Sequence, residues 1–393
     1  MTDIGLGSPL RILLTYTNFP SVAYGDVEQQ SLNYIARLRA AGFAVTGFCV
    51  TLNPPAQSCT WKELDRRWRW GDRSLLAMYE RLEQALSSCD VLINSAGSNL
   101  HPEFVAKLPA FTVFSCMDDP ENSHNLSRPA AAAYDLSLVG NIAEVETYRS
   151  WGVPYVEWTP MGLMPEIYDP TLTEMEILEG QRDIDLFLML DRSYPLRKSR
   201  LDQLADAFPS GHFYGKGWSK GYLPPAQQLA FLRRAKIGPN IHNSTGPVNY
   251  RTFYLPANGV LQICDNKSHL GQIFALGEEA VGFDRIDEGI DLCRYYLAHD
   301  RERREIAARG FRRAMRDYTE IPVFSSRVAC IERHRRTATY TRTHESAVTQ
   351  TQASTTRGRR VIFPAVQSGI AVATFARRGY RWLGRRLSRK LRP

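Results

Sequence analysis

The chain has 393 residues, of which 44% are hydrophobic and 23% charged, and it carries a formal net charge of +8. The composition is typical of a globular protein, and the length exceeds what one hydrophobic core usually serves, so two domains are predicted. Residues 335–393 contain fourteen Lys and Arg residues and one acidic residue, Glu345. The basic charge therefore belongs to the tail, and it does not indicate nucleic-acid binding by the whole protein.

The seven cysteines are scattered, mostly lie in apolar segments, and form no pair with metal-ligand spacing. This pattern is typical of reduced, buried thiols. The first nine residues lack the basic-then-apolar run of a signal peptide, and no stretch approaches the roughly 18 apolar residues of a membrane-spanning helix. A cytoplasmic protein is therefore predicted. The cysteines are Cys49, Cys59, Cys89, Cys116, Cys264, Cys293 and Cys330.

Apolar runs alternate with helical patterns in the first 160 residues. Residues 10–16 form an apolar run, residues 27–41 carry apolar side chains at helical spacing, and residues 44–50 form the next apolar run. A strand, a helix and a strand in this order predict a right-handed crossover and a parallel sheet. The segment 54–73, rich in Trp and Arg, is either a packing lid or an acceptor-binding surface. Further strands are predicted at residues 90–95, 111–116, 134–140 and 153–160.

A polar run follows the predicted strand 111–116. It contains Asp118, Asp119 and His124, which can accept or donate protons at the carboxyl end of a strand, a suitable position for a general base. The alternative is that Asp118 caps the following turn and Asp119 initiates it together with Pro120. The residues alone leave both interpretations open.

The second half begins with a predicted strand at residues 185–190, followed by a basic loop and helix start. Arg192 and Lys198 stand where the helix dipole is positive, which is unfavourable for cations unless an anion is also bound. The glycine turn around Lys216 lets the backbone approach a phosphate or nucleoside, and Lys216 adds charge. A solvated basic face and a plain tight turn are the alternatives.

The stretch 237–265 reads as two buried strands separated by a loop and a short helix. Loops and helix starts at the carboxyl ends of parallel strands bind anionic ligands, because unpaired N–H groups point outward there. His242, Asn243 and Arg251 converge at this position and are candidate ligand contacts. A structural histidine is the alternative interpretation of His242.

A set of residues in this stretch and after it resembles a known family. The set is Asn249, Arg251, Phe253, Ala257, Gly259, Asp265, Leu270, Phe274, Gly277-Glu278 and the run from Tyr295 to Glu302. It resembles the carboxyl-terminal domain of the spore-maturation-protein-type (CgeB-like) glycosyltransferases, relatives of the retaining two-domain sugar transferases with the GT-B fold. The resemblance covers roughly residues 185–335 well and the first half more loosely.

The resemblance implies an α/β fold with two Rossmann-like, doubly wound parallel-sheet domains facing a cleft. It places Arg192 and Lys198 on the diphosphate of a nucleotide-sugar donor, and it supports a proton-transfer role for the run around Asp118. It also implies a hinge at residues 158–170. The expected parts are an acceptor domain (1–165), a donor domain (166–320), a helix returning to the first domain (321–336) and a linker with a basic tail (337–393).

This chain departs from the family at two positions. Tyr254 stands where relatives commonly carry a Glu that holds the ribose hydroxyls, and Gly246 stands where the earlier Glu of the pair would fall. Tyr254 still offers a hydrogen bond but no charged acceptor. Glu278 or Glu279 is a candidate for taking over the ribose contact.

The tail has a composition of its own. Residues 337–356 are rich in Thr, Ser and Gln, which is typical of a linker. Residues 370–391 place apolar side chains three to five apart among arginines, which predicts a basic amphipathic helix on an anionic membrane surface. A nucleic-acid arm and a solvated tail are the alternatives.

We therefore predict a glycosyltransferase that moves a sugar from a nucleotide-diphosphate-sugar donor to a glycan or lipid-linked acceptor. The wider resemblance implies a retaining reaction, in which the departing phosphate takes the acceptor proton; Asp118, Asp119 or His124 would act as base in an inverting one. No metal or other cofactor is expected. The alternatives are a non-catalytic nucleotide-sugar-binding protein and a sugar-nucleotide epimerase.

Overall fold

The structure is a computed structural model that describes residues 9–337, except 22–24, 54–58, 98, 164 and 248. The predicted linker and basic tail lie outside the described residues, apart from Thr337. Among the residues described, no helix combines the length and the apolar character needed to cross a membrane.

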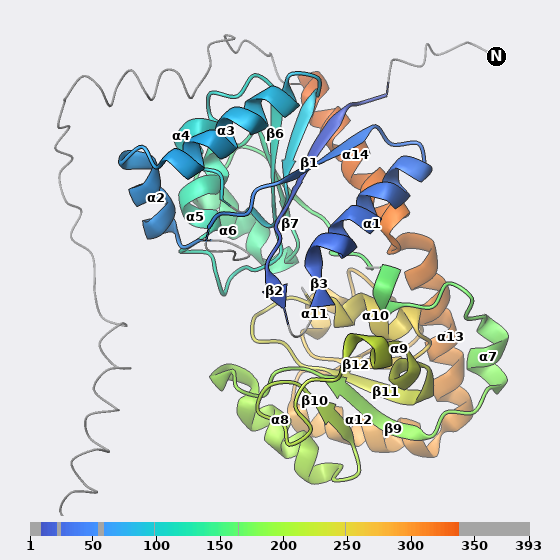
Figure 1. The fold of residues 1–393 in the computed structure, drawn as a ribbon. Helices are drawn as coiled ribbons and strands as arrows, with labels where there is room; N and C mark the ends of the chain where they lie inside the picture. Colours follow the sequence, from blue (N-terminus) through green and yellow to red (C-terminus); the bar gives the residue numbers. More distant parts are fainter. Residues whose placement is uncertain are drawn as a thin grey trace, which may run out of the picture. The chain divides into compact units, whose positions relative to one another are not determined.

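Six parallel strands form the first sheet, in the order β4-β1-β5-β6-β7-β8 (Figure 1). Alternate side chains enter different cores: Leu13 packs on one face of the sheet, and Ile12 and Leu14 pack on the other. Both faces are therefore buried, which explains why the strands read as continuous apolar runs. The strands are β1 (Ile12–Tyr16), β4 (Val45–Cys49), β5 (Val91–Asn94), β6 (Phe111–Cys116), β7 (Leu136–Val139) and β8 (Val156–Trp158).

Helices cover both faces of the first sheet. Side chains of α2 to α6 pack on the face that contains Leu13, and side chains of α1 pack on the opposite face. A short hairpin, β2 (Pro20–Ser21) with β3 (Gly25–Asp26), precedes α1. The helices are α1 (Val27–Ala40), α2 (Trp61–Arg69), α3 (Arg73–Leu86), α4 (Pro102–Val105), α5 (Ser127–Ala130) and α6 (Val145–Ser150).

The second sheet has five parallel strands in the order β10-β9-β11-β12-β13. Its two faces also have separate cores, with Leu186 and Leu188 in one and Phe187 in the other. The strands are β9 (Ile184–Met189), β10 (His212–Tyr214), β11 (Ala235–Asn240), β12 (Leu261–Cys264) and β13 (Val281–Gly282). The helices are α7 (Glu174–Glu179), α8 (Pro195–Ala207), α9 (Pro225–Arg234), α10 (Arg251–Ala257), α11 (Lys267–Leu270), α12 (Ile286–Ala298) and α13 (Asp300–Asp317). The predicted fold class, two parallel-sheet α/β domains, is confirmed.

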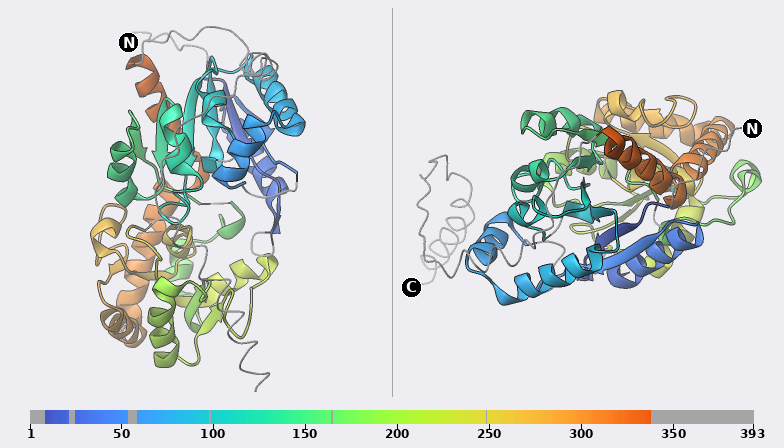
Figure 2. Two further views of the ribbon diagram at one scale, coloured as in Figure 1. Left: turned by 90° about the vertical axis from the view of Figure 1, so that its left-hand side faces the viewer. Right: turned by 90° about the horizontal axis from the view of Figure 1, so that it is seen from above.

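The last described helix, α14 (Glu320–Thr337), belongs to the first domain although it follows the second in sequence. Its Phe324 and Ile331 pack into the core that contains Ile12 and Leu14. Arg327 donates hydrogen bonds to Thr159 Oγ1 (3.1 Å) and to the carbonyl oxygen of Pro160 (2.9 Å). Figure 2 shows α14 alongside the first sheet.

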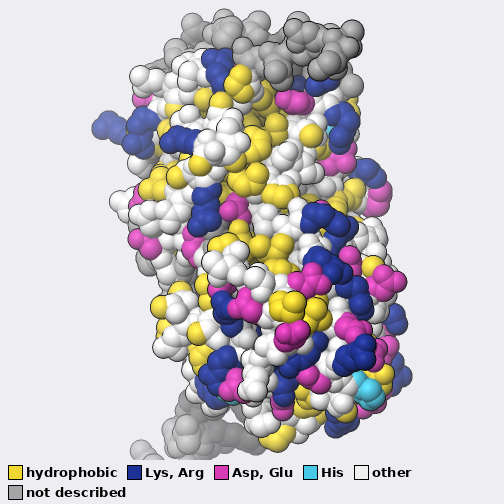
Figure 3. Space-filling view, turned by 90° about the vertical axis from the view of Figure 1, so that its right-hand side faces the viewer, with side chains coloured by type: hydrophobic (Ala, Val, Ile, Leu, Met, Phe, Trp, Pro, Cys, Tyr) yellow, Lys and Arg dark blue, Asp and Glu magenta, His cyan; other side chains and the backbone are white. Residues whose placement is uncertain are grey.

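Charged side chains of both signs are interleaved on the face shown in Figure 3. Many of those on α13 form ion pairs, such as Arg301 with Glu305 on the same helix and Arg312 with Glu174 on α7. One face of α13 is therefore exposed and charged, while Ile306 and Phe311 on the other face are buried.

Candidate functional site

The carboxyl ends of β11 and β12 meet around Asp265, the first residue beyond β12. Its carboxylate accepts hydrogen bonds from the backbone N–H of His242 (3.0 Å), from His242 Nδ1 (2.6 Å) and from Arg200 Nη1 (2.8 Å). Arg200 also donates to the carbonyl oxygen of His242 (2.7 Å). The start of the loop after β11 is therefore tied to both β12 and α8.

His242 is 2% exposed, and its ring is held in one orientation by Asp265. Because a carboxylate only accepts, Nδ1 carries the proton and Nε2 presents a lone pair. Burial lowers the pKa of His242; the hydrogen bond and charge of Asp265 oppose this, and the charges of Arg251 and Arg197 reinforce it. Nε2 is buried without a hydrogen-bond partner among the described residues. A neutral histidine with a free acceptor atom therefore lies next to two arginines.

Arg197 contributes the most buried cation of this site, with 6% of the residue exposed. It occupies the inner stripe of α8 together with Leu201 and Leu204, at the spacing of one helix face. Burial, followed by the charge of Arg251, lowers its pKa to about 10. Its Nε donates to the carbonyl oxygen of Asp191 (3.1 Å), and it forms no ion pair with a carboxylate among the residues described. Buried charges normally have such a partner, so this site is suited to an anionic ligand.

Arg251 approaches the same place from the first turn of α10. Its Nε donates to Asn240 Oδ1 (3.0 Å), and Asn249 Nδ2 donates to the same oxygen (3.2 Å). Asn240, fully buried at the end of β11, in turn donates to Gln262 Oε1 on β12 (3.0 Å). This chain of hydrogen bonds fixes the base of the Arg251 side chain relative to both strands.

Arg192 and Lys198 lie differently from the expectation. Both form ion pairs with Asp202, Arg192 through Nε (2.6 Å) and Lys198 through Nζ (2.5 Å). Lys216 is exposed on the adjoining turn, where its backbone accepts from the N–H of Arg192 (2.8 Å). The guanidinium of Arg192 also lies 5.1 Å from the ring centre of Trp218. These three cations form a peripheral group next to β9 and β10, and their donor-binding role stays a prediction.

The other predicted donor contacts are dispersed. Asn243 follows His242 and has a buried Oδ1 without a hydrogen-bond partner among the described residues, so it stays a candidate. Tyr254 packs into the apolar core of the second domain. Glu278 is exposed on the turn that precedes β13, at the amino-terminal edge of a parallel sheet and therefore on the side opposite His242.

In the first domain, the polar run after β6 separates into different environments. Asp119 is 1% exposed and accepts hydrogen bonds from Ser127 Oγ (2.6 Å) and from Tyr148. Asp118 is exposed to solvent, but its pKa is raised. The main cause is desolvation by the surrounding protein, and the negative charges of Asp119 and Glu121 add to it. His124 is exposed on the next turn. Asp118 is thus the carboxyl best suited to proton transfer, and Asp119 has the bonding of a structural residue.

The polar loops of the two domains meet at Gly246. A Cβ atom built on Gly246, whose φ is +103°, would lie 2.0 Å from Asn141 Oδ1, just beyond β7. Asn141 is held in place because its Oδ1 accepts from the N–H of Ala143 (3.0 Å) and its Nδ2 donates to the carbonyl oxygen of Asp119 (3.2 Å). Glycine is therefore required at 246, and the glutamate of the family pattern has no space.

Two clusters of described residues bring metal-binding atoms together, and one of them lies here. His242, Cys264 and Asp265 place their ligand atoms within 4.8 Å of one another. However, Asp265 is already bonded to His242 and Arg200, and the nearby arginines would repel a cation. The surroundings of this cluster therefore favour the binding of an anion over the binding of a metal ion.

Part of the second domain matches a known protein family. Residues 197–321 match the family model described as "Glycosyl transferase-like". This glycosyl transferase-like segment begins at Arg197 and includes His242, Arg251 and Asp265. None of the curated proteins matches the chain.

Solved structures extend the likeness to both domains. Sucrose-phosphate synthase from Thermosynechococcus elongatus has a TM-score of 0.59 at 11% identity, covering 84% of this chain and 100% of that one. Alr3699/HepE from Anabaena, solved with UDP-glucose, has a TM-score of 0.54 at 11% identity, covering 82% and 100%. A glycosyltransferase from Rickettsia africae has a TM-score of 0.53 at 11% identity, covering 84% and 100%. These structural similarities establish the GT-B fold for the two domains. The narrower resemblance to the CgeB-like proteins stays a prediction.

The environment of His242 leads to a pH dependence of stability. Its pKa is lowered in the folded protein, so the unfolded chain takes up the proton first, near pH 6.5. The stabilising contribution is therefore complete above about pH 6.5 and is lost as the pH falls below it. Urea unfolding of the wild type and His242→Asn, in which the amide nitrogen replaces Nδ1, should show a steeper loss of free energy of unfolding in the wild type on acidification. Parallel pH profiles would contradict the assignment of a neutral His242.

Proposed function

We propose that the chain is a glycosyltransferase that transfers a sugar from a nucleotide-diphosphate-sugar donor held by the second domain to an acceptor held by the first. The observation that carries this proposal is the buried Arg197, without a carboxylate partner among the described residues, beside Arg251 and the free Nε2 of His242 in the glycosyl transferase-like segment. The GT-B fold and the binding of UDP-glucose by Alr3699/HepE support it.

Arg197 and Arg251 neutralise the donor diphosphate in this proposal. Preorganised cations in a poorly hydrated site stabilise the charge that develops on the leaving group more than cations in water would. Nε2 of His242 accepts a hydrogen bond from a hydroxyl group of the donor, because a lone pair would repel a fully ionised phosphate. The positive end of the α8 dipole adds to this charge, although Pro195 has no N–H and the N–H groups of Arg197 and Lys198 donate to the carbonyl oxygen of Tyr194.

The transfer breaks the bond between the anomeric carbon and the diphosphate oxygen and forms a bond to the acceptor oxygen. In the retaining course, which we favour from the family resemblance, the acceptor proton passes to the departing phosphate. In an inverting course, Asp118 takes the proton, since it is exposed and its pKa is raised. In either course, the outer parts of the donor contact Arg192, Lys198 and Lys216. For this, Arg192 and Lys198 must leave their ion pairs with Asp202.

A non-catalytic nucleotide-sugar-binding protein is the second candidate. Gly246 and Tyr254 replace both carboxylates of the family pattern. A glutamate at either position would be destabilising, because Gly246 faces Asn141 and Tyr254 is in the core. Such a protein would keep the arginine site and bind the donor without turnover.

Incubating the protein with a panel of nucleotide sugars and candidate acceptors tests the function. Transfer or donor hydrolysis supports the glycosyltransferase, binding without turnover supports the second candidate, and an isomerised donor would indicate an epimerase. Asp118→Asn and Asp119→Asn form a matched pair. Asp118→Asn should leave the free energy of unfolding nearly unchanged and lower the rate only if the reaction inverts, whereas Asp119→Asn should cost about 1–3 kcal/mol through its buried bonds.

The acceptor side is less defined by the described residues. Trp70, the residue that follows α2, is 77% exposed with Arg66 above its ring, which supports an acceptor surface. Trp68 on α2 is buried against His101, which supports packing. The proposed attachment of the basic tail to an anionic membrane rests on its sequence pattern alone. It would be checked by vesicle sedimentation with and without residues 357–393. A location at the inner face of the membrane is part of that proposal.

A further inference from the structure

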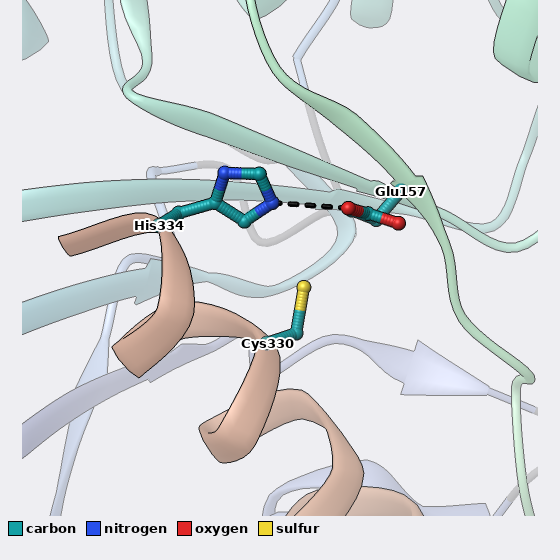
Figure 4. A group of neighbouring side chains, drawn as sticks. All are labelled: Glu157, Cys330 and His334. Atoms are coloured by element: carbon teal, nitrogen blue, oxygen red, sulfur yellow. Dashed lines mark hydrogen bonds and ion pairs between the residues drawn. The ribbon is translucent and has the colours of Figure 1, made fainter. Parts of the chain in front are cut away.

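A second cluster of metal-binding atoms lies in the first domain, away from the arginine site. Cys330 and His334 are four residues apart on α14 and therefore share one face of the helix. Glu157 points toward both of them from β8, the last strand of the first sheet (Figure 4). His334 Nε2 lies 3.0 Å from Glu157 Oε1, and the three ligand atoms lie within 4.8 Å of one another.

The three groups are a thiol, an imidazole and a carboxylate, a donor set that suits Zn²⁺ and related divalent transition metals. Around a tetrahedral zinc ion, ligand atoms lie about 3.5 Å apart. The cluster needs shifts of only about an ångström to reach this arrangement, which rotations of the Cys330 and Glu157 side chains can supply. Three protein ligands would leave the fourth position to water.

The surroundings allow a cation to enter. Cys330 is 9% exposed, and Glu157 and the edge of His334 are partly accessible. The ring of Tyr155 lies 5.1 Å from that of His334 and restricts its orientation. Arg333 Nη2 is 3.5 Å from Glu157 Oε1, but the Arg333 side chain is largely exposed and can turn into solvent when a metal binds.

We propose that Glu157, Cys330 and His334 bind one Zn²⁺ ion, which fastens α14 to the last strand of the first sheet. The role is structural, since the cluster is separate from the residues that we assign to sugar transfer. Metal binding displaces the Cys330 proton, so affinity increases with pH.

Titration of the full-length, chelator-treated protein with Co²⁺ tests the proposal, because a cobalt–thiolate bond gives a charge-transfer band in the near ultraviolet. One equivalent of Co²⁺ should produce the band, and Zn²⁺ should abolish it by competition. Cys330→Ser should remove the band, and His334→Ala should weaken binding by about a hundredfold or more, because even losing a group behind a ligand costs 10- to 100-fold. The matched controls Cys89→Ser and His299→Ala change a cysteine and a histidine of other surface regions and should bind like the wild type.

Thermal unfolding gives a readout that does not depend on the variants being well folded. Zn²⁺ should raise the melting temperature of the wild-type protein relative to the chelator-treated form, because a ligand of the folded state stabilises it. Failure of the wild type to show either the cobalt band or the zinc-dependent increase would overturn the proposal. A band that persists in Cys330→Ser would also overturn it, because it would show that another cysteine binds the metal.

Discussion

Replacing Arg197 with methionine is expected to weaken the binding of a nucleoside diphosphate such as UDP by about 10- to 100-fold. The reason is that a charged hydrogen bond to the diphosphate contributes about 1.5–3 kcal/mol. The same substitution should leave the free energy of unfolding unchanged or raise it by about 1 kcal/mol, because it removes a buried charge that has no carboxylate partner among the described residues and leaves an apolar side chain in line with Leu201 and Leu204. Isothermal titration calorimetry and urea unfolding measure the two effects.

Lys198→Met is the matched control. Lys198 is the next residue along α8, it is more than half exposed, and its charge is paired with Asp202. If Arg197 is the cation that receives the diphosphate, Lys198→Met should change binding by only about two- to threefold, because exposed charges are screened. Equal losses in both variants would favour the arrangement expected from the sequence, and an unchanged affinity in Arg197→Met would refute the role of Arg197.

Gly246→Ala is expected to be among the most damaging single-methyl additions in the described part of the chain. The added Cβ would meet Asn141 Oδ1, which is held by two hydrogen bonds, at a backbone φ of +103°. We expect a loss of about 2–4 kcal/mol in the free energy of unfolding, combining left-handed backbone strain with overpacking. Nucleotide binding should also weaken, because the displaced loop connects His242 to Arg251 at the start of α10.

Gly42→Ala separates the two causes. Gly42 has a similar φ of +93°, but nothing lies within 4 Å of where its Cβ would be, so only the backbone strain of about 1–2 kcal/mol applies. Combining Gly246→Ala with Asn141→Ala should recover part of the overpacking cost, and the coupling is measured by a double-mutant cycle. If Gly246→Ala and Gly42→Ala lower the free energy of unfolding by the same amount, Gly246 does not lie in close contact with Asn141.

The local structure around the site was predictable because each strand, loop and helix has a recognisable pattern in the sequence. The strand, loop, helix and strand of residues 237–265 appear as predicted, and α10 ends where Asn258 and Gly259 occur, with Gly259 at a φ of +64°. The parallel order of the strands follows from the right-handed crossover rule. The fold class could therefore be inferred before the structure.

The directions of the basic side chains were harder to predict. Arg197 and Lys198 are adjacent in sequence, yet one residue on a helix is a rotation of about 100°, which places one in the interior and the other in solvent. The signal for Arg197 was its spacing with Leu201 and Leu204, which marks it as part of the buried stripe. Tyr254 was expected near the ligand from the family pattern, but the apolar neighbours Phe253 and Leu255 place this turn of α10 in the core.

Contacts between residues far apart in sequence could not be inferred at all. The collision that requires glycine at 246 involves Asn141, from the other domain. The spacing of Cys330 and His334 was visible in the sequence, but it carries little meaning until Glu157 is brought beside them by the packing of α14 on the first sheet.

The position of α14 also bears on how the protein is made. A ribosome synthesises the strands of the first sheet early and α14 only near the end of the described chain, yet Phe324 and Ile331 cover the side chains of Ile12 and Leu14. Until α14 emerges, the part of this face that α1 does not cover stays exposed to water and to other chains. The first domain therefore cannot complete its folding until the second domain and α14 have been synthesised.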